Sequence, residues 1–237
     1  MAAEIQTERP AITIDIYSDV VCPWCYIGKR KFELGLAQVE DDLGVDVVVT
    51  YKPHQLDPTA APGVATPVFE GYSKKFGGPE RAEQIIGHVT KAAAEIGLDF
   101  RMDRALRANT LLAHRLIWLA AQSDSPVEQP VMKERLLEAY FTDGLNIGDA
   151  DVLAECAAEV GFDRDRVVEF LESDRGLPEV MTELREGYEN GVTAVPTFVF
   201  DGNWAVPGAQ EPDTFAQVLQ RMADRALGEP AADQTPA

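Results

Sequence analysis

Two cysteines three residues apart follow directly after a segment with the alternation of a β-strand. In residues 11–18, Ile12, Ile14 and Ile16 alternate with polar or aromatic residues, which is the period of two expected for a half-buried strand. Residues 22–25 then read Cys-Pro-Trp-Cys. Proline is tolerated in the first turn of a helix, so a helix is predicted to begin here and to continue to about residue 39. A strand therefore leads straight into a helix whose N-terminus carries the first cysteine.

Further patterns place the rest of a sheet at the two ends of the chain. A β-branched run at residues 45–51 predicts a second strand. The runs 197–200 and 203–206 flank Asp201-Gly202, a strong signal for a two-residue hairpin turn. An amphipathic helix is expected at about residues 212–227. This order is typical of a thioredoxin-type sheet.

The middle of the chain carries amphipathic helical patterns and no strong strand signal. Several of these patterns end beside a glycine, which readily closes a helix. The predicted helices span residues 79–97, 104–122, 128–142, 149–161, 163–173 and 178–190. We predict an α/β protein, with a thioredoxin-like fold and a large α-helical insertion domain. Its predicted parts are an arm at 1–10, a discontinuous thioredoxin-like domain at 11–55 and 191–227, the insertion at 56–190, and a disordered tail at 228–237.

The charge balance excludes several kinds of partner. Asp and Glu number 40 against 21 Lys and Arg, which gives a net charge of −19. Such a surface repels phosphate groups, so nucleic acid is not an expected partner. No stretch approaches the roughly 20 apolar residues of a membrane span, so no membrane association is expected. The N-terminus lacks the basic and apolar regions of a secretory signal, and cytoplasmic residence is expected.

The position of the cysteine pair predicts thiol chemistry. The thiolate is the reactive form, and a helix N-terminus stabilises an anion through its unpaired N–H groups and its dipole. Cys22 takes that position and is the predicted nucleophile. Cys25, one turn deeper, is predicted to be the more covered, resolving thiol, while Pro23 and Trp24 tune the reduction potential.

Two other interpretations of the cysteine pair are a zinc site and a coincidental spacing. A zinc site needs about four ligands, and the remaining cysteine and the histidines supply no recognisable second half of such a site: Cys156, His54, His88 and His114. No metal is therefore expected. Two core cysteines spaced by coincidence are the other alternative, and the strand-to-helix placement with an intervening proline argues against it.

Several polar residues and one further thiol have predicted roles. Asp15 and Asp19 are candidates for assisting Cys25, although capping of the active-site helix is the expected use of Asp19. Cys156 falls on an apolar helical face and is predicted to be a buried structural thiol.

Histidines and one asparagine lie near or within the helical block. His114 is expected to form a structural hydrogen bond across the block, with a proton shuttle as the alternative. His54, at the end of the second strand, is expected to be a surface residue; the alternative is that the following loop brings it near the active edge of the sheet. Asn109 is expected to cap a helix or a turn.

The chain resembles the DsbA superfamily, specifically its FrnE-like branch. The similarity begins at residues 18–25, Ser-Asp-Val-Val-Cys-Pro-Trp-Cys, which look like that family's active-site segment. Further matches, in the family's order, are Asn-Thr at 109–110 with Ala-His-Arg-Leu at 113–116, Ala-Tyr-Phe at 139–141 with Gly144, and Gly-Val-Thr-Ala-Val-Pro-Thr-Phe at 191–198. The resemblance implies a thiol-disulfide oxidoreductase that reduces, forms or isomerises disulfides.

The same resemblance assigns substrate binding to residues around the cysteine pair. In the family, the proline matching Pro196 is cis and faces the cysteines, leaving the backbone at Val195 to pair with an extended substrate. Pro23, Trp24 and, from glutathione-using relatives, Asn109 are further predicted substrate-binding residues. The alternative for Pro196 is a trans proline opening an edge strand, since only about 5–6% of X-Pro bonds are cis.

Expected partners are protein or peptide thiols and disulfides, or a small thiol substrate, for a monomer or homodimer. No bound cofactor is expected, and glutathione is a candidate thiol donor. The alternative function is a glutathione-dependent isomerase or transferase resembling 2-hydroxychromene-2-carboxylate isomerase or kappa-class glutathione transferases, which typically have serine in place of the first cysteine. The presence of both Cys22 and Cys25 favours the oxidoreductase. A chaperone-like binding role is a third possibility, secondary to the cysteine pair.

Overall fold

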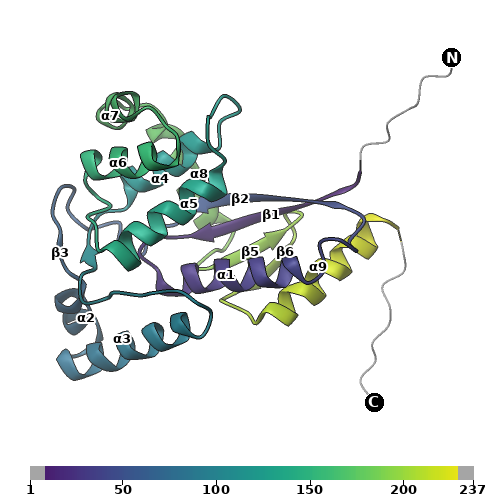
Figure 1. The fold of residues 1–237 in the computed structure, drawn as a ribbon, viewed down its shortest axis with the longest axis horizontal. Helices are drawn as coiled ribbons and strands as arrows, with labels where there is room; N and C mark the ends of the chain where they lie inside the picture. The colour runs from purple at the N-terminus through teal and green to yellow at the C-terminus, as the bar shows by residue number, and fades with distance from the viewer. Residues whose placement is uncertain (1–8, 229–237) are drawn as a thin grey trace.

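The structure of the protein is a computed structural model that describes residues 9–228 (Figure 1). Four strands form a mixed sheet in the order β2-β1-β5-β6. The central strand β1 (Ala11–Ser18) pairs in parallel with β2 (Asp46–Pro53) and antiparallel with β5 (Thr197–Phe200). Strand β6 (Trp204–Pro207) completes the sheet antiparallel to β5. The thioredoxin-like α/β fold predicted from the sequence is therefore confirmed.

The alternation in β1 explains why this strand lies at the centre. Ile12, Ile14 and Ile16 are all buried on one face, where they join the main hydrophobic core. Ile14 aligns with Val49 of β2 on one side and with Phe200 of β5 on the other. A strand with neighbours on both edges places its C-terminal end, and the segment that follows, in the interior of the molecule.

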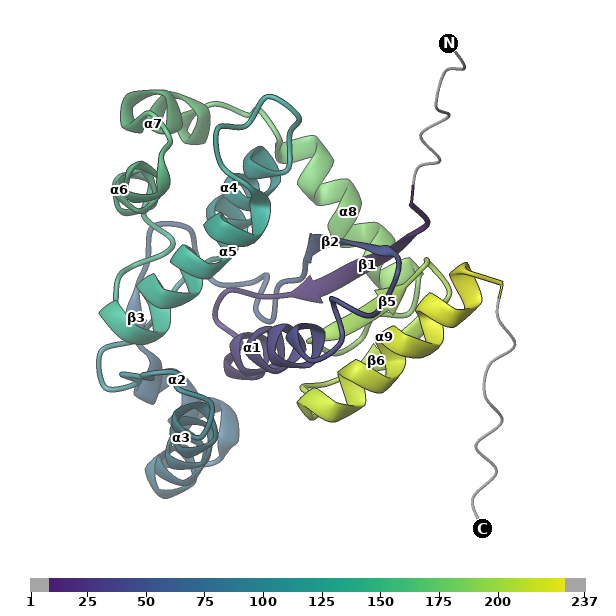
Figure 2. The ribbon, with the colours of Figure 1, turned by 45° about the vertical axis from the view of Figure 1, so that its right-hand side comes forward.

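Three helices cover the two faces of this sheet (Figure 2). Helix α1 (Pro23–Ala37) and helix α9 (Pro212–Ala226) pack together on one face, and α8 (Leu177–Glu189) packs against β2 on the other. The contact of α1 with α9 is close at Gly35, where an added Cβ would lie 2.5 Å from the carbonyl oxygen of Pro212. Only glycine allows the two helices to approach this far.

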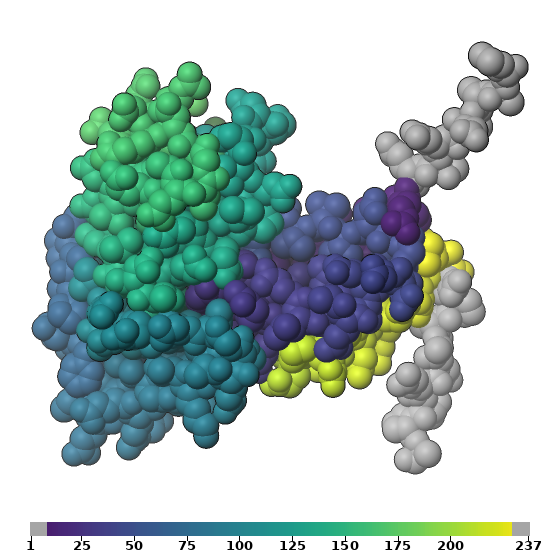
Figure 3. Space-filling view, viewed as in Figure 1, coloured from purple at the N-terminus to yellow at the C-terminus, as the bar shows by residue number. Residues whose placement is uncertain are grey.

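The chain between β2 and α8 forms the helical insertion. It stands at one end of the molecule in the space-filling view, coloured blue to green (Figure 3). Its elements are β3 (Thr66–Pro67), α2 (Val68–Phe76), α3 (Pro79–Ala94), β4 (Leu106–Arg107), α4 (Leu111–Ala120), α5 (Gln129–Glu138), a π-helical turn (Ala139–Asp143), α6 (Ala150–Val160) and α7 (Arg164–Glu172). Helix α8 falls within residues 56–190, but it packs against β2 and therefore also covers one face of the sheet.

The predicted helix at 104–122 is wrong in its first third. Residues 106 and 107 instead form β4, which pairs with β3, so the insertion contains a short two-stranded sheet that the sequence patterns did not reveal. The side chain of Asn109 accepts a hydrogen bond from the backbone N–H of Leu111 (2.9 Å) and thereby fixes the start of α4 at this point. Helix α2 was also not predicted, because the loop residues before it dominate that region.

The hairpin between β5 and β6 contains the predicted turn at Asp201-Gly202, with one residue more between the paired strands than predicted. Phe200 pairs with Trp204, which leaves residues 201–203 in the loop. Asp201 has a left-handed φ of 46°, and its carboxylate accepts a hydrogen bond from the backbone N–H of Thr13 (2.9 Å). The backbone N–H of Asp201 donates to the carbonyl of Thr13 (2.8 Å), and the N–H of Asn203 donates to the carbonyl of Phe200 (3.0 Å), which closes the turn.

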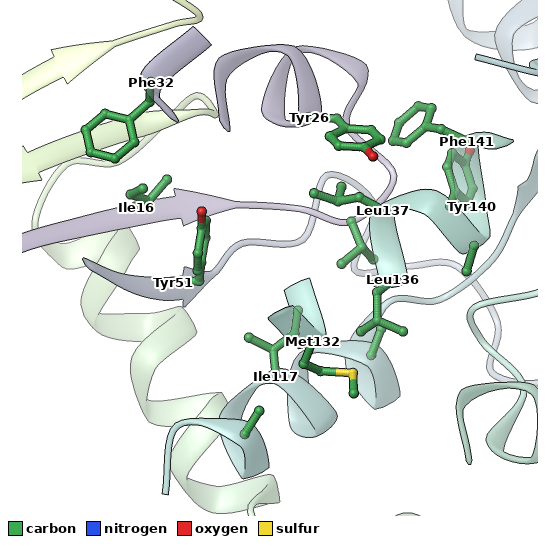
Figure 4. Close-up of a cluster of buried hydrophobic side chains, with 14 of the residues drawn as sticks. Ile16, Tyr26, Phe32, Tyr51, Ile117, Met132, Leu136, Leu137, Tyr140 and Phe141 are labelled. Carbon is green, nitrogen blue, oxygen red and sulfur yellow. The ribbon is translucent and has the colours of Figure 1, made fainter. Parts of the chain in front are cut away.

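The hydrophobic core is continuous from the sheet into the insertion. Figure 4 shows Ile16 and Tyr51 of the sheet close to Met132, Leu136 and Leu137 of α5. No helix among residues 9–228 is long and apolar enough to cross a membrane. The disordered tail predicted at 228–237, apart from Gly228, and most of the predicted arm at 1–10 lie outside the described residues.

Candidate active site

Cys22 is the N-cap residue of α1, as its position before Pro23 predicted. Its backbone is extended, with φ −87° and ψ 114°, and the backbone N–H groups of Cys25 and Tyr26 donate hydrogen bonds to its carbonyl oxygen (3.0 and 3.4 Å). No side chain caps this helix. The side chain of Cys22 therefore stands at the N-terminus of α1, where the unpaired N–H groups of the first turn stabilise an anion.

Both thiols are buried and free in this structure. The exposed fraction is 4% for Cys22 and 2% for Cys25, so Cys25 is only slightly more covered than Cys22. Burial, followed by the neighbouring Cys22, raises the pKa of Cys25 well above its ordinary value. Cys25 therefore keeps its proton at neutral pH.

The predicted cis peptide bond between Val195 and Pro196 is confirmed. The thiol of Cys22 lies 3.8 Å from the carbonyl oxygen of Val195, within the range of a weak S–H···O contact. The Pro196 ring packs on α1 at Gly28, where an added Cβ would lie 2.9 Å from the ring carbon Cγ. The loop before β5 and the first turns of α1 thus meet at the dithiol.

The helical insertion approaches the cysteine pair from a second side. Trp24, 37% exposed, lies against the imidazole of His88 from α3, with ring centroids 5.6 Å apart. Burial, and after it the charge of Cys22, raise the pKa of Tyr72 in α2 to about 12. The dithiol therefore sits at the junction of the sheet and the insertion, beside an exposed aromatic side chain.

Asp19 takes part in a buried hydrogen-bond cluster instead of capping α1, so the capping prediction is wrong. Its carboxylate lies 3.2 Å from Nε2 of His114 and accepts a hydrogen bond from the backbone N–H of Leu56 (2.8 Å). Burial alone would raise the pKa of Asp19, but these bonds outweigh it and the pKa is lowered. The backbone carbonyl of Asp19 accepts from the N–H of Cys22 (3.3 Å), which connects this cluster to the dithiol.

His114 forms the structural hydrogen bond that was expected of it. Its Nε2 atom lies between two acceptors, the Asp19 carboxylate and the carbonyl oxygen of His54 (3.1 Å), so Nε2 carries a hydrogen in this arrangement. His54 itself is buried against Tyr188, with ring centroids 5.3 Å apart, and the surface position predicted for it is wrong. The hydrogen bond from His114 to the carbonyl oxygen of His54 connects α4 with the end of β2.

Of the other predicted residues, Asn109 and Cys156 have structural positions, and Asp15 does not lie beside the dithiol. Asn109 precedes the N-cap residue Thr110, accepts a hydrogen bond from the N–H of Leu111 (2.9 Å) and donates one to the carbonyl of Ala60 (2.7 Å), so it holds a turn at the start of α4, one of the two structural roles predicted for it. Cys156 is buried in α6, as its apolar spacing predicted. Asp15 lies within the β1–β2 pairing, and the structure shows Asp19, not Asp15, beside the dithiol.

One charged residue near the dithiol was not found from the sequence. Lys133 of α5 is buried, and burial lowers its pKa to about 8, while the charges of Cys25 and Asp19 oppose that shift. In the sequence it stands in the polar run Met-Lys-Glu-Arg at 132–135, which reads as a solvated helix face. Its i+4 spacing from the buried Gln129 was the available signal.

Residues 9–228 contain no group of three or more His, Cys, Asp or Glu side chains placed to hold a metal ion. The arrangement instead offers a helix-terminal thiol, a protonated buried thiol three residues later, and a carbonyl group at the first sulfur. These are the parts needed for thiol-disulfide exchange through a mixed disulfide.

Comparison with known proteins agrees with this geometry. Residues 13–220 match the family described as DSBA-like thioredoxin domain. The protein YwbO of Bacillus subtilis (strain 168) is 30% identical over 211 residues, covering 88% of this chain and 96% of that protein. The crystal structure of the probable DsbA oxidoreductase SCO1869 from Streptomyces coelicolor superimposes with a TM-score of 0.80 at 31% identity, covering 95% of this chain and 92% of that one.

A more distant structure shares the fold. The cytosolic disulfide reductase DsbM from Pseudomonas aeruginosa, solved with GSH, superimposes with a TM-score of 0.60 at 16% identity. The match covers 89% of this chain and 98% of that one. At this identity the likeness concerns the fold alone.

Proposed function

The chain belongs to the DSBA-like thioredoxin domain family, and from that premise we propose that it is a thiol-disulfide oxidoreductase with Cys22 as nucleophile and Cys25 as resolving thiol. One observation carries the assignment of roles. Cys22 stands at the N-terminus of α1 with its sulfur near the Val195 carbonyl, whereas Cys25 is held in its protonated form by burial. Cys22 is therefore placed to attack a substrate disulfide, and Cys25 remains protonated until the mixed disulfide has formed.

The proposed reaction has two exchange steps. The Cys22 thiolate attacks one sulfur of a substrate disulfide, the substrate S–S bond breaks, and one substrate thiolate leaves. A mixed disulfide then joins Cys22 to the other substrate sulfur. Cys25 loses its proton and attacks the Cys22 sulfur, which releases the second substrate thiolate and leaves a Cys22–Cys25 disulfide. The reverse sequence transfers that disulfide to a substrate dithiol.

The surroundings of the dithiol favour protein or peptide substrates. Trp24 offers an exposed apolar face next to the nucleophile, and an extended segment passing the Val195–Pro196 loop would contact both. Pro23, Trp24, Val195 and Pro196 are accordingly the proposed substrate contacts. The side chain of Asn109 is hydrogen-bonded to the backbone of Leu111 at the start of α4 and to that of Ala60, so it is not among the proposed substrate contacts.

We propose glutathione as the thiol donor that returns the disulfide to the dithiol form, and the cytoplasm as the place of action. Support for both comes from DsbM, which shares the fold, is described as a cytosolic disulfide reductase and was solved with GSH. The placement in the FrnE-like branch belongs to the same proposal.

The test uses three single variants of the full chain and a peptide disulfide, with glutathione as reductant. Cys25→Ser is expected to accumulate a mixed disulfide on Cys22, detectable by mass, and to turn over slowly. Cys22→Ser is expected to form none. Cys156→Ala is the matched control and should behave as wild type, because Cys156 lies in α6 away from the pair.

Two outcomes would contradict the proposal. Equal trapping by Cys22→Ser and Cys25→Ser would show that the roles are misassigned. Full glutathione-dependent isomerase or transferase activity in the Cys25→Ser variant, without disulfide exchange in the wild type, would favour the alternative function, since that chemistry needs no second thiol.

A further inference from the structure

The position of the Cys22 sulfur depends on a turn that joins β1 to α1. The backbone N–H of Cys22 donates to the carbonyl oxygen of Asp19 (3.3 Å), while the carbonyl of Cys22 accepts from the N–H groups of Cys25 and Tyr26 inside the helix. Both backbone groups of the nucleophile are therefore bound, one to Asp19 and the other to α1. A shift of Asp19 would move Cys22 relative to the helix N-terminus and to the carbonyl of Val195, 3.8 Å from its sulfur.

The side chain of Asp19 ties this turn to two other parts of the chain. Asp19 is fully buried, and its carboxylate oxygens have different partners. Oδ2 accepts from the backbone N–H of Leu56 (2.8 Å), and Oδ1 lies 3.2 Å from Nε2 of His114. Leu56 follows β2, and His114 belongs to α4 of the insertion. Two segments distant in sequence thus hold the residue whose carbonyl binds the nucleophile.

The two partners of the Asp19 side chain require two acceptor oxygens. The N–H of Leu56 can only donate, and Nε2 of His114 also donates because its other neighbour is the carbonyl oxygen of His54 (3.1 Å). An asparagine would turn its NH₂ group toward one of these donors and lose that bond. Burial raises the pKa of Asp19, but the bonds to His114 and Leu56 lower it by more, so the side chain is ionised at neutral pH.

The same contacts hold the Asp19 carboxylate away from the start of α1. An aspartate near the beginning of a helix commonly caps it, because its oxygen accepts from the N–H groups of the first turn. Within the described residues 9–228, no side chain caps α1. The N–H groups that stabilise an anion there are consequently left to the thiol of Cys22.

We propose that Asp19 is a positioning residue for the nucleophile, anchored by His114 and Leu56, which holds Cys22 at the N-terminus of α1 without competing for the N–H groups there. The inference rests on the proposed function, in which Cys22 attacks first. In that step the Cys22 thiolate forms an S–S bond with one substrate sulfur, the substrate S–S bond breaks, and the other sulfur leaves as a thiolate with the bonding electron pair. Asp19 and His114 transfer no proton in this step and act through geometry.

The first test measures the attack by Cys22 alone. In the Cys25→Ser background, an aromatic disulfide reagent releases one coloured thiolate when Cys22 attacks it. His114→Leu removes one anchor at similar side-chain size and should slow this release about tenfold or more at pH 7. Asp19→Asn should slow it as well, because one of the two bonds is lost. His114→Gln keeps N–H donors near the place of Nε2 and should stay within about threefold of the Cys25→Ser parent.

Ser18→Ala is the matched control for these variants. Ser18 is adjacent to Asp19 and is also buried, but its hydroxyl oxygen has no hydrogen-bond partner among residues 9–228. The substitution removes a buried polar group without affecting the turn or its anchors, so the release should keep the rate of the parent. A loss as large as that of His114→Leu would show that any change at this place slows the attack, and would overturn the positioning role.

Hydrogen exchange separates positioning from stability. In folded His114→Leu and Asp19→Asn, the amide of Cys22 should exchange with deuterium faster than in the parent, because its bond to the Asp19 carbonyl is loosened. Amides within β1 should keep their protection. A merely structural role would instead lower the melting temperature and speed exchange in β1 and α1 alike.

The remaining outcomes are equally decisive. Parental release and parental Cys22 protection in folded His114→Leu would overturn the proposal, as would a His114→Gln variant as slow as His114→Leu. Faster release by Asp19→Asn would show that the charge of Asp19 hinders the thiolate more than its position helps, which also overturns it. If His114→Leu does not fold, Asp19→Asn decides by the same criteria. If the parent releases no coloured thiolate, the proposed function fails, whereas exchange at the Cys22 amide still reports on the turn.

Discussion

Nε2 of His114 lies 3.2 Å from the Oδ1 atom of Asp19, and both side chains are buried. The two residues come from α4 and from the loop between β1 and α1, so this contact joins the insertion to the sheet directly behind the dithiol. Removal of one partner leaves the other polar group buried without its main bond, and breaking a buried pair in this way costs about 3–5 kcal/mol.

His114→Ala is therefore expected to lower the free energy of unfolding by about 3–5 kcal/mol in urea titrations at pH 7. In the Asp19→Asn background the same substitution should cost at least about 1 kcal/mol less, because the charge that His114 stabilises is gone. Additive effects of the two substitutions would show that the pair is not coupled.

The same pair predicts a pH dependence. The pKa of Asp19 is lower in the folded protein than its usual value of 3.8, so the folded state stabilises the carboxylate. This contribution is fully present above about pH 4–5 and is lost as the pH falls through the lower, folded-state pKa. The stability difference between wild type and Asp19→Asn should thus shrink below pH 4. A constant difference from pH 6 to pH 3 would contradict the assignment.

Gly28 predicts how closely the Pro196 loop must approach α1. An added Cβ at Gly28 would lie 2.9 Å from the Pro196 ring, so Gly28→Ala must displace the loop and should cost about 1–3 kcal/mol and reduce peptide exchange. Gly87→Ala in α3 is the matched control, since a Cβ there meets nothing within 4 Å. Its higher helix propensity should stabilise the protein by up to about 1 kcal/mol. Similar melting shifts for both variants would refute the close-packing argument.

Trp24 is predicted to serve substrates more than stability. Because 37% of this side chain is exposed, Trp24→Ala should slow exchange with a peptide disulfide much more than with a small disulfide reagent, while thermal stability changes little. Trp204→Ala is the control: Trp204 is 50% exposed on β6 and contacts Arg225, away from the cysteine pair. Equal kinetic losses in the two variants would remove Trp24 from the substrate contacts.

Cys156 is predicted to be inert. Burial raises its pKa, so in native protein it should resist alkylation at pH 7–8 over times in which Cys22 reacts completely. Cys156→Ala should cost about 1 kcal/mol of stability and leave exchange unchanged. Rapid modification of Cys156 under native conditions, measured by peptide mapping, would show a local opening of α6.

Features that depend on neighbouring residues were predicted from the sequence, whereas contacts between residues far apart in the chain were not. The helix start at Cys22 and Pro23 and the alternation in β1 are local signals, and both were predicted with their boundaries nearly correct. The contact of Asp19 with His114 spans 95 positions, and no local pattern indicates which side chains will meet across that distance. A capping role was the better local explanation for Asp19, and tertiary packing overrode it.

The burial of Lys133 was not predicted from the sequence for a related reason. A lysine flanked by Glu134 and Arg135 has the pattern of a solvated face, and burial of one member depends on how α5 rotates against β2. That rotation is set by the bonds from Gln129 to Tyr51, 78 positions apart. Similarly, the carboxylate of Asp201 accepts a hydrogen bond from the backbone N–H of Thr13, 188 positions away, a contact that only the assembled sheet provides.

The meeting of Cys22 with Val195 also has a consequence for synthesis of the chain. The two residues are separated by 173 positions, so at about 5–20 residues per second the ribosome delivers Val195 about 9–35 s after Cys22. During that interval β1 lacks its partner β5, and α1 lacks α9. The cysteine pair of each nascent chain is consequently open to oxidants and to foreign thiols, and its enclosure marks the completion of folding.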